Sequence, residues 1–574
     1  MLIFKLIYMK DMKQIIYLLA LTLLAVATLP GCKKSYLDKP PLSAITDANF
    51  YKTDEQVMAG TAPLYSSVWF DYNDAASWQL GDFRGGDAFD AWYDNANSKF
   101  NTTPDNQYNQ SAWRSFYIVI AQSNLAIVNI NRYAGPAVSP QVKKTAIAEA
   151  RFMRALAYRY LVMNWGAVPI IENNLEHLND TTIRRNTVSS VWRFITREMR
   201  AVAADLPSIA SQPGRLTKWS AEGMLARFYL TRAGVESSGG ARKQEFLDSA
   251  KYYAANVINN SGYKLLDKYE DLFRWNEKTG YRYDNNSESL FELQWIFSND
   301  WGVSNSLPEY LAYSGEVAYA GYGGSKGATW WIMSLYDGFD LQPNGSLKGR
   351  TLDQRLHATY MLPGFSYPEM TKKSDKSKFV YPMTGTDNNY VAIKKYVIGG
   401  PDDLGSSASA QHYPNDVYML RLAELYLIYA EASIGNSTST TDVTAVAYFN
   451  KIHQRAGLPA WLISGANSNG PLTLDVVFNE RFKEFAMEGA TWYDLVSLYY
   501  WNPTKAIAIL NSQDRGLFFA QVNNFNNPTE WTLTKTSWYA PRLINANAGN
   551  FAMPIPAIEL SQAPNLQAAA VDYP

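Results

Sequence analysis

The residues of this sequence that could do covalent chemistry form only weak motifs. Residues 323–327, GGSKG, match the G-x-S-x-G pattern of serine hydrolases, with Ser325 as the nucleophile. That pattern works when a strand precedes the serine and a helix follows it inside a parallel sheet. No alternating series of strands and helices surrounds residues 323–327. We therefore interpret this segment as a flexible aromatic loop.

Three glutamates spaced four residues apart offer a second chemistry. Glu480, Glu484 and Glu488 would be neighbours on one helix. A retaining glycosidase holds two carboxyl groups about 5 Å apart, so a surface glycoside hydrolase is one alternative. Such a pair, however, flanks a cleft from two elements, whereas nearby Arg481 and Lys483 favour ion pairing on a solvated helical face. We predict no catalytic residue and no enzyme.

Metal and cofactor motifs are equally weak. The aspartates of residues 82–94 do not follow the spacing of a calcium-binding loop, and no glycine-rich phosphate loop occurs. The four histidines are scattered and lack zinc-binding spacing: His177, His357, His412 and His453. We predict neither a metal nor a cofactor.

The positive signal is aromatic. Tyr 39, Phe 25 and Trp 17 make up 14% of the chain, and residues 69–95 and 295–331 combine Trp and Tyr with Asp, Asn and Gly. Exposed rings can cover the apolar face of a sugar while polar side chains bond its hydroxyls. These two segments predict a carbohydrate-binding surface, with a peptide ligand left open as an alternative.

Helices must position these loops. The pattern L-A-x-x-Y-L occurs at 156–161, 225–230 and 422–427, each within a run of helical period, and is similar to the core of a tetratricopeptide unit. Further helices are predicted over residues 188–206, 245–260, 442–456 and 474–500. Residues 66–112 and 275–415 are instead loop-rich, with a few short strands such as SLFELQWIF, residues 289–297.

The N-terminus carries the only cysteine. Lys10 and Lys13 precede an apolar run over 15–29, as in a secretory signal, and LPGC, residues 29–32, looks like a bacterial lipobox. We predict a signal peptide over residues 1–31 and lipid attachment at Cys32, which would tether the chain to a membrane. An ordinary signal peptide with an incidental cysteine is the alternative. The formal net charge of −1 gives no field for nucleic acid.

Several blocks in order along the chain resemble the SusD/RagB family of outer-membrane lipoproteins. They include SYLDKPP, EARFMRALAYRYLVMNWGAVPII, YMLRLAELYLIYAEA and NERFKEFAMEGATWYDLV. The resemblance implies a mostly α-helical fold, in which tetratricopeptide-like helix pairs frame a loop-rich half with few short strands. Residues 32–574 would form a single domain, with the helical scaffold including 141–260 and 416–500 and the loop-rich half including 66–112 and 275–415.

The resemblance also implies a function. Family members bind glycan, some bind peptide, and they cap a SusC-like TonB-dependent transporter without doing chemistry. It implies a location on the outer membrane, facing the cell exterior. A tetratricopeptide scaffold for envelope assembly is a further alternative. The ligand-binding residues carried over from the family come from the two aromatic loops: Arg84, Asp87, Trp92, Tyr93, Trp301, Tyr310, Tyr313, Tyr322 and Trp330. Trp330 and Trp331 begin a predicted helix, so at least one of them faces inward.

Overall fold

The computed structural model describes residue 17 and residues 46–91, 96–178, 180–276, 279–343, 347–382, 391–405, 409–516, 531–533 and 540–574. Cys32 and, apart from Tyr17, the predicted signal peptide lie outside these residues. In the described part of the chain, no helix has the length and apolarity needed to cross a membrane.

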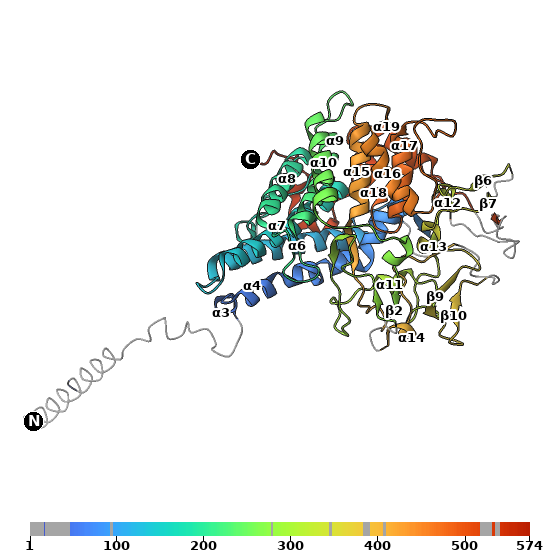
Figure 1. Ribbon diagram of the computed structural model, residues 1–574. Coiled ribbons are helices and arrows are strands. Elements are labelled where there is room, and N and C mark those ends of the chain that lie inside the picture. Colours follow the sequence, from blue (N-terminus) through green and yellow to red (C-terminus); the bar gives the residue numbers. More distant parts are fainter. Residues whose placement is uncertain are drawn as a thin grey trace, which may run out of the picture.

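Long helices form a row along one half of the molecule (Figure 1). From α6 to α10, each helix packs against the next along the chain, and α10 then packs against α15 of the second group. The bounds in the first group are α3 Asp47–Phe50, α4 Asp54–Thr61, α6 Gln107–Tyr133, α7 Pro140–Trp165, α8 Val188–Asp205, α9 Lys218–Val235 and α10 Gln244–Asn260. Those in the second are α15 Leu422–Ile434, α16 Val443–Arg455, α17 Leu474–Phe485, α18 Thr491–Tyr499, α19 Pro503–Ser512 and α20 Ala557–Gln562.

The three L-A-x-x-Y-L segments lie on α7, α9 and α15, which are inner helices of this row. Every residue from 152 to 165 of α7 is buried, because α6 and α8 cover it on either side. Ser139 starts α7 by accepting a hydrogen bond from the Val142 amide, and Gly166, with φ of 71°, ends it. The predicted tetratricopeptide-like scaffold is confirmed.

The other half consists of short elements (Figure 1). Its helices are α5 Ala96–Lys99, α11 Leu307–Leu311, α12 Trp330–Ser334, α13 Arg355–Thr359 and α14 Pro401–Leu404. Two π-helical turns, η3 Tyr72–Ala76 and η4 Gln79–Phe83, precede the first strand. Across both halves, single 3-10 turns lie at η1 Ala62–Tyr65, η2 Ser67–Trp69, η5 Asn174–His177, η6 Tyr269–Leu272, η7 Ala548–Phe551 and η8 Pro564–Gln567.

The strands form small antiparallel sheets. One has four strands in the order β1 Ala88–Asp90, β5 Lys326–Ala328, β11 Ala392–Ile393 and β8 Tyr360–Met361. Another has the order β15 Trp531–Leu533, β7 Leu347–Gly349 and β6 Phe339–Leu341. The two-stranded pairs are β2 Trp275–Asn276 with β3 Tyr281–Arg282, β4 Ser289–Leu293 with β12 Val417–Arg421, β9 Ser366–Thr371 with β10 Lys378–Val380, and β13 Ser439–Thr440 with β14 Leu472–Thr473. The strand predicted within SLFELQWIF is β4.

A buried ion network fastens the two halves together. Arg421, the last residue of β12, lies 2.6 Å from Glu288, 3.0 Å from Glu484 and 2.7 Å from Glu488. Arg355 of α13 reaches Glu480 at 2.8 Å, and Lys395 reaches Glu488 at 2.9 Å. All of these side chains are at most 5% exposed. The expected solvated face of Glu480, Glu484 and Glu488 was therefore wrong: these carboxylates are interior and neutralise arginines from distant segments.

The single helix predicted over residues 474–500 was also wrong. The chain leaves α17 after Phe485 and starts α18 at Thr491, and Met487 and Gly489 between them have φ of 62° and 67°. The Gly489 amide donates a hydrogen bond to Asp82 at 2.7 Å, and Glu488 is held by Arg421 and Lys395. These long-range partners interrupt a sequence whose local pattern is helical throughout.

Candidate functional site

Strand pairing brings the two aromatic loops together. β1 lies in the first loop and β5 in the second, and their register places Asp90 opposite Lys326. Beyond the pair, the Ala91 amide donates a hydrogen bond to the Ser325 carbonyl at 3.0 Å. Residues more than 230 positions apart in the chain thus share one sheet edge.

A hollow of about 380 Å³ opens at this junction. Its walls come from the residue before η4, the end of β1, the first turn of α6, α11, and the turn before β5 together with the start of that strand. The residues that line it are Trp78, Asp90, Tyr108, Tyr310, Gly321, Tyr322, Gly324, Ser325 and Lys326. We call this the aromatic hollow.

Four rings give the aromatic hollow its apolar surface. Trp78 is buried, and its ring centroid lies 6.2 Å from that of Tyr108 and 6.3 Å from that of Tyr310. Tyr322 lies 6.0 Å from Tyr310 and is 42% exposed, so it stands at the rim. Because the rings are tilted relative to one another, a curved ligand could stack its apolar C–H groups on several of them.

The turn that carries Tyr322 is held by Glu309 of α11. One carboxylate oxygen accepts hydrogen bonds from the Ala320 and Gly321 amides, both at 2.6 Å, and the Tyr322 amide donates to the Glu309 carbonyl. Gly321 has φ of +74°, and a Cβ there would lie 2.2 Å from the Ser314 carbonyl carbon. The turn therefore requires glycine at this position.

Polar groups lie among the rings. The Lys326 ammonium is 3.6 Å from Asp90, donates to the Tyr322 carbonyl at 2.7 Å and lies 5.3 Å from the Trp78 ring centroid. Burial lowers the pKa of Lys326, which Asp90 opposes. Ser325 Oγ and Trp78 Nε1 are buried and have no hydrogen-bond partner among the described residues. A buried polar group without a partner costs about 1–3 kcal/mol, so a ligand hydroxyl or a water that reached these atoms would stabilise them.

Tyr310 and Tyr322 were both named from the sequence and line the aromatic hollow together. Trp301 is 61% exposed and lies near it: its ring centroid is 6.0 Å from that of His412, whose neighbour Gln411 donates to the Tyr310 hydroxyl at 3.1 Å. Trp301 also packs edge-on against Phe70 at 5.0 Å. Trp301 is therefore placed to extend the stacking surface beyond the rim of the aromatic hollow.

Four other carried-over residues lie in the interior. The Arg84 guanidinium lies between Phe100 and Trp492, 4.4 and 4.5 Å from their ring centroids. Asp87 is fully buried and accepts a hydrogen bond from the Thr491 hydroxyl at 2.9 Å. Tyr313 and Trp330 are 5% and 7% exposed. Their burial takes all four away from a ligand surface.

Trp92 and Tyr93 lie outside the described residues and stay predictions. The expectation that Trp330 or Trp331 faces inward is met by both, since Trp331 is 8% exposed.

The sequence reasoning did not select Trp78, Tyr108 or Lys326. Trp78 and Lys326 lie within the two aromatic segments, so composition could find the region but not the side chains. The sequence offers Asp90 as a candidate for calcium binding and Ser325 as a candidate for hydrolysis, and neither as a sugar-binding residue. The strand register of Asp90 and Lys326 is the missing information, since it decides which residues of the two loops meet.

The geometry does not assemble a hydrolase around Ser325. This residue precedes a strand instead of a helix, and its hydroxyl makes no hydrogen bond to a histidine in the described part of the chain. Among the residues that line the aromatic hollow, Asp90 is the one carboxylate. The site offers stacking and hydrogen bonding.

A second hollow of about 390 Å³ lies elsewhere in the loop-rich half. It is lined by Arg274, Trp275, Asn276, Thr279, Tyr281, Pro368, Glu369 and Lys378. Trp275 in this hollow is only 1% exposed, whereas Tyr281 is 37% exposed and is therefore the ring that a ligand could reach. The aromatic hollow therefore offers more stacking surface.

Comparison with known proteins identifies the class. A family model described as the SusD family matches residues 287–571, and one described as starch-binding, associating with outer membrane, matches residues 35–230. A SusD-like protein of Bacteroides ovatus is 34% identical over 98% of this chain and 98% of its own length. The chain belongs to the SusD family.

Solved structures agree with this assignment. One, described as a crystal structure with xylogluco-oligosaccharide, is 31% identical, covers 90% of this chain and 99% of its own, and superposes with a TM-score of 0.77. A more distant sequence relative, the starch-binding protein SusD of Bacteroides thetaiotaomicron, is 24% identical over 61% of this chain and 63% of its own length. The match to the structure with xylogluco-oligosaccharide spans both the helical and the loop-rich half.

Proposed function

We propose that this chain is a non-catalytic, glycan-binding lipoprotein of the outer membrane. The observation that carries the proposal is the aromatic hollow, where Trp78, Tyr108, Tyr310 and Tyr322 surround the Asp90–Lys326 pair. Rings cover the apolar faces of sugar units, and the charged pair and Ser325 are placed to bond hydroxyls. The relative with xylogluco-oligosaccharide supports a β-glucan-type oligosaccharide as the first ligand to test.

A peptide ligand is the second candidate from the same family. The aromatic hollow favours sugar, because the buried partnerless groups, Ser325 Oγ and Trp78 Nε1, match scattered hydroxyls better than the regular backbone of an extended strand. Titration with a peptide library would give binding comparable to that of glycans if peptide were the ligand.

Titration calorimetry with xylogluco-oligosaccharide tests the site. We expect Tyr310→Ala, Tyr322→Ala and Trp301→Ala each to weaken binding about tenfold or more, because a few rings dominate binding at such surfaces. Tyr281→Ala, in the second hollow, is the matched control and should leave affinity within about twofold. If Tyr281→Ala weakens binding and the three other variants do not, the glycan binds in the second hollow.

The absence of turnover is tested on the same ligand. We expect no reducing sugar to be released over a day at a concentration that saturates binding. Turnover that disappears in Ser325→Ala or Glu484→Gln would replace the binding assignment with a hydrolase.

We infer further that the chain is anchored through Cys32, faces the cell exterior and delivers its ligand to a SusC-like TonB-dependent transporter. The family model that matches residues 35–230 is described as associating with the outer membrane, and this description supports the location. Affinity purification from detergent-solubilised outer membranes should recover a large β-barrel protein together with the chain. Recovery of the chain without such a partner would contradict the delivery role.

A further inference from the structure

The helix α8 belongs to the helical row (Figure 1), and its exposed positions include several arginines. Arg193, Arg197 and Arg200 recur at intervals of four and three residues, so they share one face of the helix. Like charges at these spacings destabilise a helix, and Glu198 of the same helix pairs with Arg151 and Arg154 instead. The three arginines on the exposed face of α8 therefore repel one another, and the packing of the helix does not require them.

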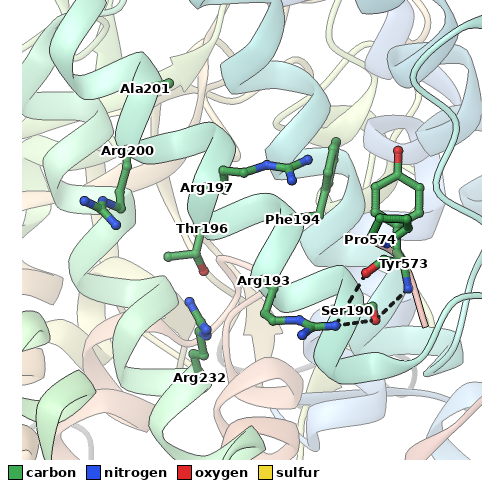
Figure 2. A pocket seen from close by; sticks show the side chains of 10 residues that line it. All are labelled: Ser190, Arg193, Phe194, Thr196, Arg197, Arg200, Ala201, Arg232, Tyr573 and Pro574. Atoms are coloured by element: carbon green, nitrogen blue, oxygen red, sulfur yellow. Dashed lines mark hydrogen bonds between the residues drawn. The ribbon is translucent and has the colours of Figure 1, made fainter.

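These arginines line a hollow of about 570 Å³ together with Arg232 from the last turn of α9. Figure 2 shows the four side chains around it, with Phe194 and Tyr573 side by side at one end. Phe194 is buried, and its ring centroid lies 6.0 Å from that of Tyr573. We call this the arginine hollow.

The last residues form a fixed wall of the arginine hollow. Val571 forms a parallel bridge with Asn186, and Asp572 accepts a hydrogen bond from the Thr187 hydroxyl at 2.8 Å. The Tyr573 amide donates a hydrogen bond to Ser190 Oγ at 3.0 Å, and the Tyr573 hydroxyl donates one to Glu172 at 2.5 Å. The wall is therefore held by side chains of the helical half.

Negative charge in the protein balances only part of this cluster. Arg232 pairs with Glu236 at 2.6 Å, and Arg197 lies 3.7 Å from Glu172, which Arg154 also approaches. Arg193 donates to the neutral Ser190 hydroxyl and Tyr573 carbonyl. Neither Arg193 nor Arg200 forms an ion pair with any carboxylate among the described residues. In a chain with a formal net charge of −1, this is a local positive excess.

We propose that the arginine hollow binds a phosphate or sulfate ester. Planar guanidinium groups bond tetrahedral oxyanions through paired N–H donors, and a dianion would neutralise Arg193 and Arg200 and relieve the repulsion along α8. The ester could belong to a soluble sugar or to a lipid headgroup of the membrane, which present the same chemistry. The proposal is separate from glycan binding, because no residue is shared between the two hollows.

Calorimetry with inorganic pyrophosphate on the purified full chain tests the site. We expect one pyrophosphate per chain, affinity that falls as salt is added, and at least tenfold weaker binding by Arg193→Gln/Arg200→Gln. The control Arg132→Gln/Lys451→Gln removes the same charge from exposed positions of α6 and α16 and should bind like the parent. The arginine variant should unfold at about the same temperature as the parent, because the repulsion that it loses offsets the lost hydrogen bonds from Arg193 to Ser190 and Tyr573. An unchanged unfolding temperature separates loss of the site from loss of the fold.

Two further probes identify the source of the ester. Tight binding of glucose 6-phosphate by the parent, weakened in Arg193→Gln/Arg200→Gln, would assign a sugar ester. Stronger retention on phosphatidylglycerol than on phosphatidylcholine vesicles, lost in that variant, would assign a lipid headgroup. If the parent fails to bind pyrophosphate, or if the control and the arginine variant weaken its binding equally, the proposal is overturned. Xylogluco-oligosaccharide binding should be unchanged in either double variant.

Discussion

At the scale of single residues, the aromatic hollow depends on a backbone position as much as on its rings. Tyr322 is placed by the turn that Glu309 holds, and Gly321 lets that turn pass within contact of Ser314. The rings themselves look ordinary in the sequence. What distinguishes Tyr322 from buried tyrosines such as Tyr313 is the direction that this turn gives it.

We therefore expect Gly321→Ala to disturb glycan binding by moving the turn that carries Tyr322. The added Cβ would lie 2.2 Å from the Ser314 carbonyl carbon, so the turn must move and take Tyr322 with it. Gly262→Ala is the control, because Gly262 has a similar φ of +81° but open space around a Cβ. Both variants should lose about 1 kcal/mol of stability from backbone strain, and Gly321→Ala should lose more because its Cβ also meets backbone atoms. Only Gly321→Ala should weaken xylogluco-oligosaccharide binding. Equal affinity of the two variants would show that the turn does not position the site.

At the scale of elements, the buried ion network decides how α15, α16 and α17 meet the loop-rich half. Arg455 of α16 lies 2.9 Å from Glu288 and 2.5 Å from Glu484, and so joins the same carboxylates as Arg421. Burial alone would raise the pKa of Glu484, but Arg455, Arg421 and Arg355 outweigh it and hold that pKa below its ordinary value. This carboxylate is thus stabilised as an anion in the interior.

Removal of one partner from this network should be costly. We expect Arg421→Met to lower the free energy of unfolding by about 3–5 kcal/mol, because it removes from three buried carboxylates the one cation that they all share. The matched substitution Arg114→Met removes an arginine that is 64% exposed and paired with Asp71, and should cost at most about 1 kcal/mol. Urea denaturation of both variants measures the difference. Similar losses would mean that the network contributes no more than a surface pair.

At the scale of the whole molecule, buried carboxyl groups predict how stability varies with pH. Burial raises the pKa of Asp87 to about 7 and that of Glu292 to about 7. Between about pH 4 and pH 7, these two groups therefore bind more protons in the folded protein than in the unfolded chain. Their stabilising contribution is present below this interval and is lost as the pH rises through it. Carboxyl groups with lowered pKa, such as Glu424 at about 2, act in the opposite sense but mostly below this interval. Burial also lowers the pKa of His357, which opposes the effect of the two carboxyl groups within the interval.

The slope of unfolding free energy against pH should consequently be negative between about pH 4.5 and pH 7. Each group contributes at most about 1.4 kcal/mol per pH unit, and Asp87→Asn should flatten the slope by up to that amount. Asp375→Asn is the control, because hydrogen bonds from Ser377 lower the pKa of that exposed carboxyl and move its effect below the interval. Chemical denaturation at several pH values measures the slope. A slope that Asp87→Asn leaves unchanged would contradict the raised pKa.

The predicted anchor also belongs to this scale. Cys32→Ser should abolish incorporation of radiolabelled palmitate and leave the chain unprocessed or released from the membrane, because the thiol is the atom that receives the lipid. Ser35→Ala, three residues further along the chain, is the control substitution and should keep the label. A labelled, membrane-bound Cys32→Ser protein would exclude lipid attachment at Cys32.

The sequence by itself determined the helical scaffold and the family. The periods over residues 188–206, 245–260 and 442–456 predicted α8, α10 and α16 to within a residue or two, because amphipathic helices are encoded by local spacing. The aromatic segments were also recognisable, since their composition differs from that of the helices. These properties depend on residues that are close together in the chain.

Only the tertiary structure decided which aromatic residues are exposed and where helices stop. Trp78, Trp301 and Trp330 all lie in the aromatic segments, yet one lines a hollow, one is exposed and one is core. Likewise, the local pattern of residues 486–490 is helical, but no helix forms there. Asp82 binds the Gly489 amide, and Arg421 and Lys395 bind Glu488, all from distant parts of the chain. Burial and strand register arise from contacts between segments far apart in the chain, and local spacing carries no record of them.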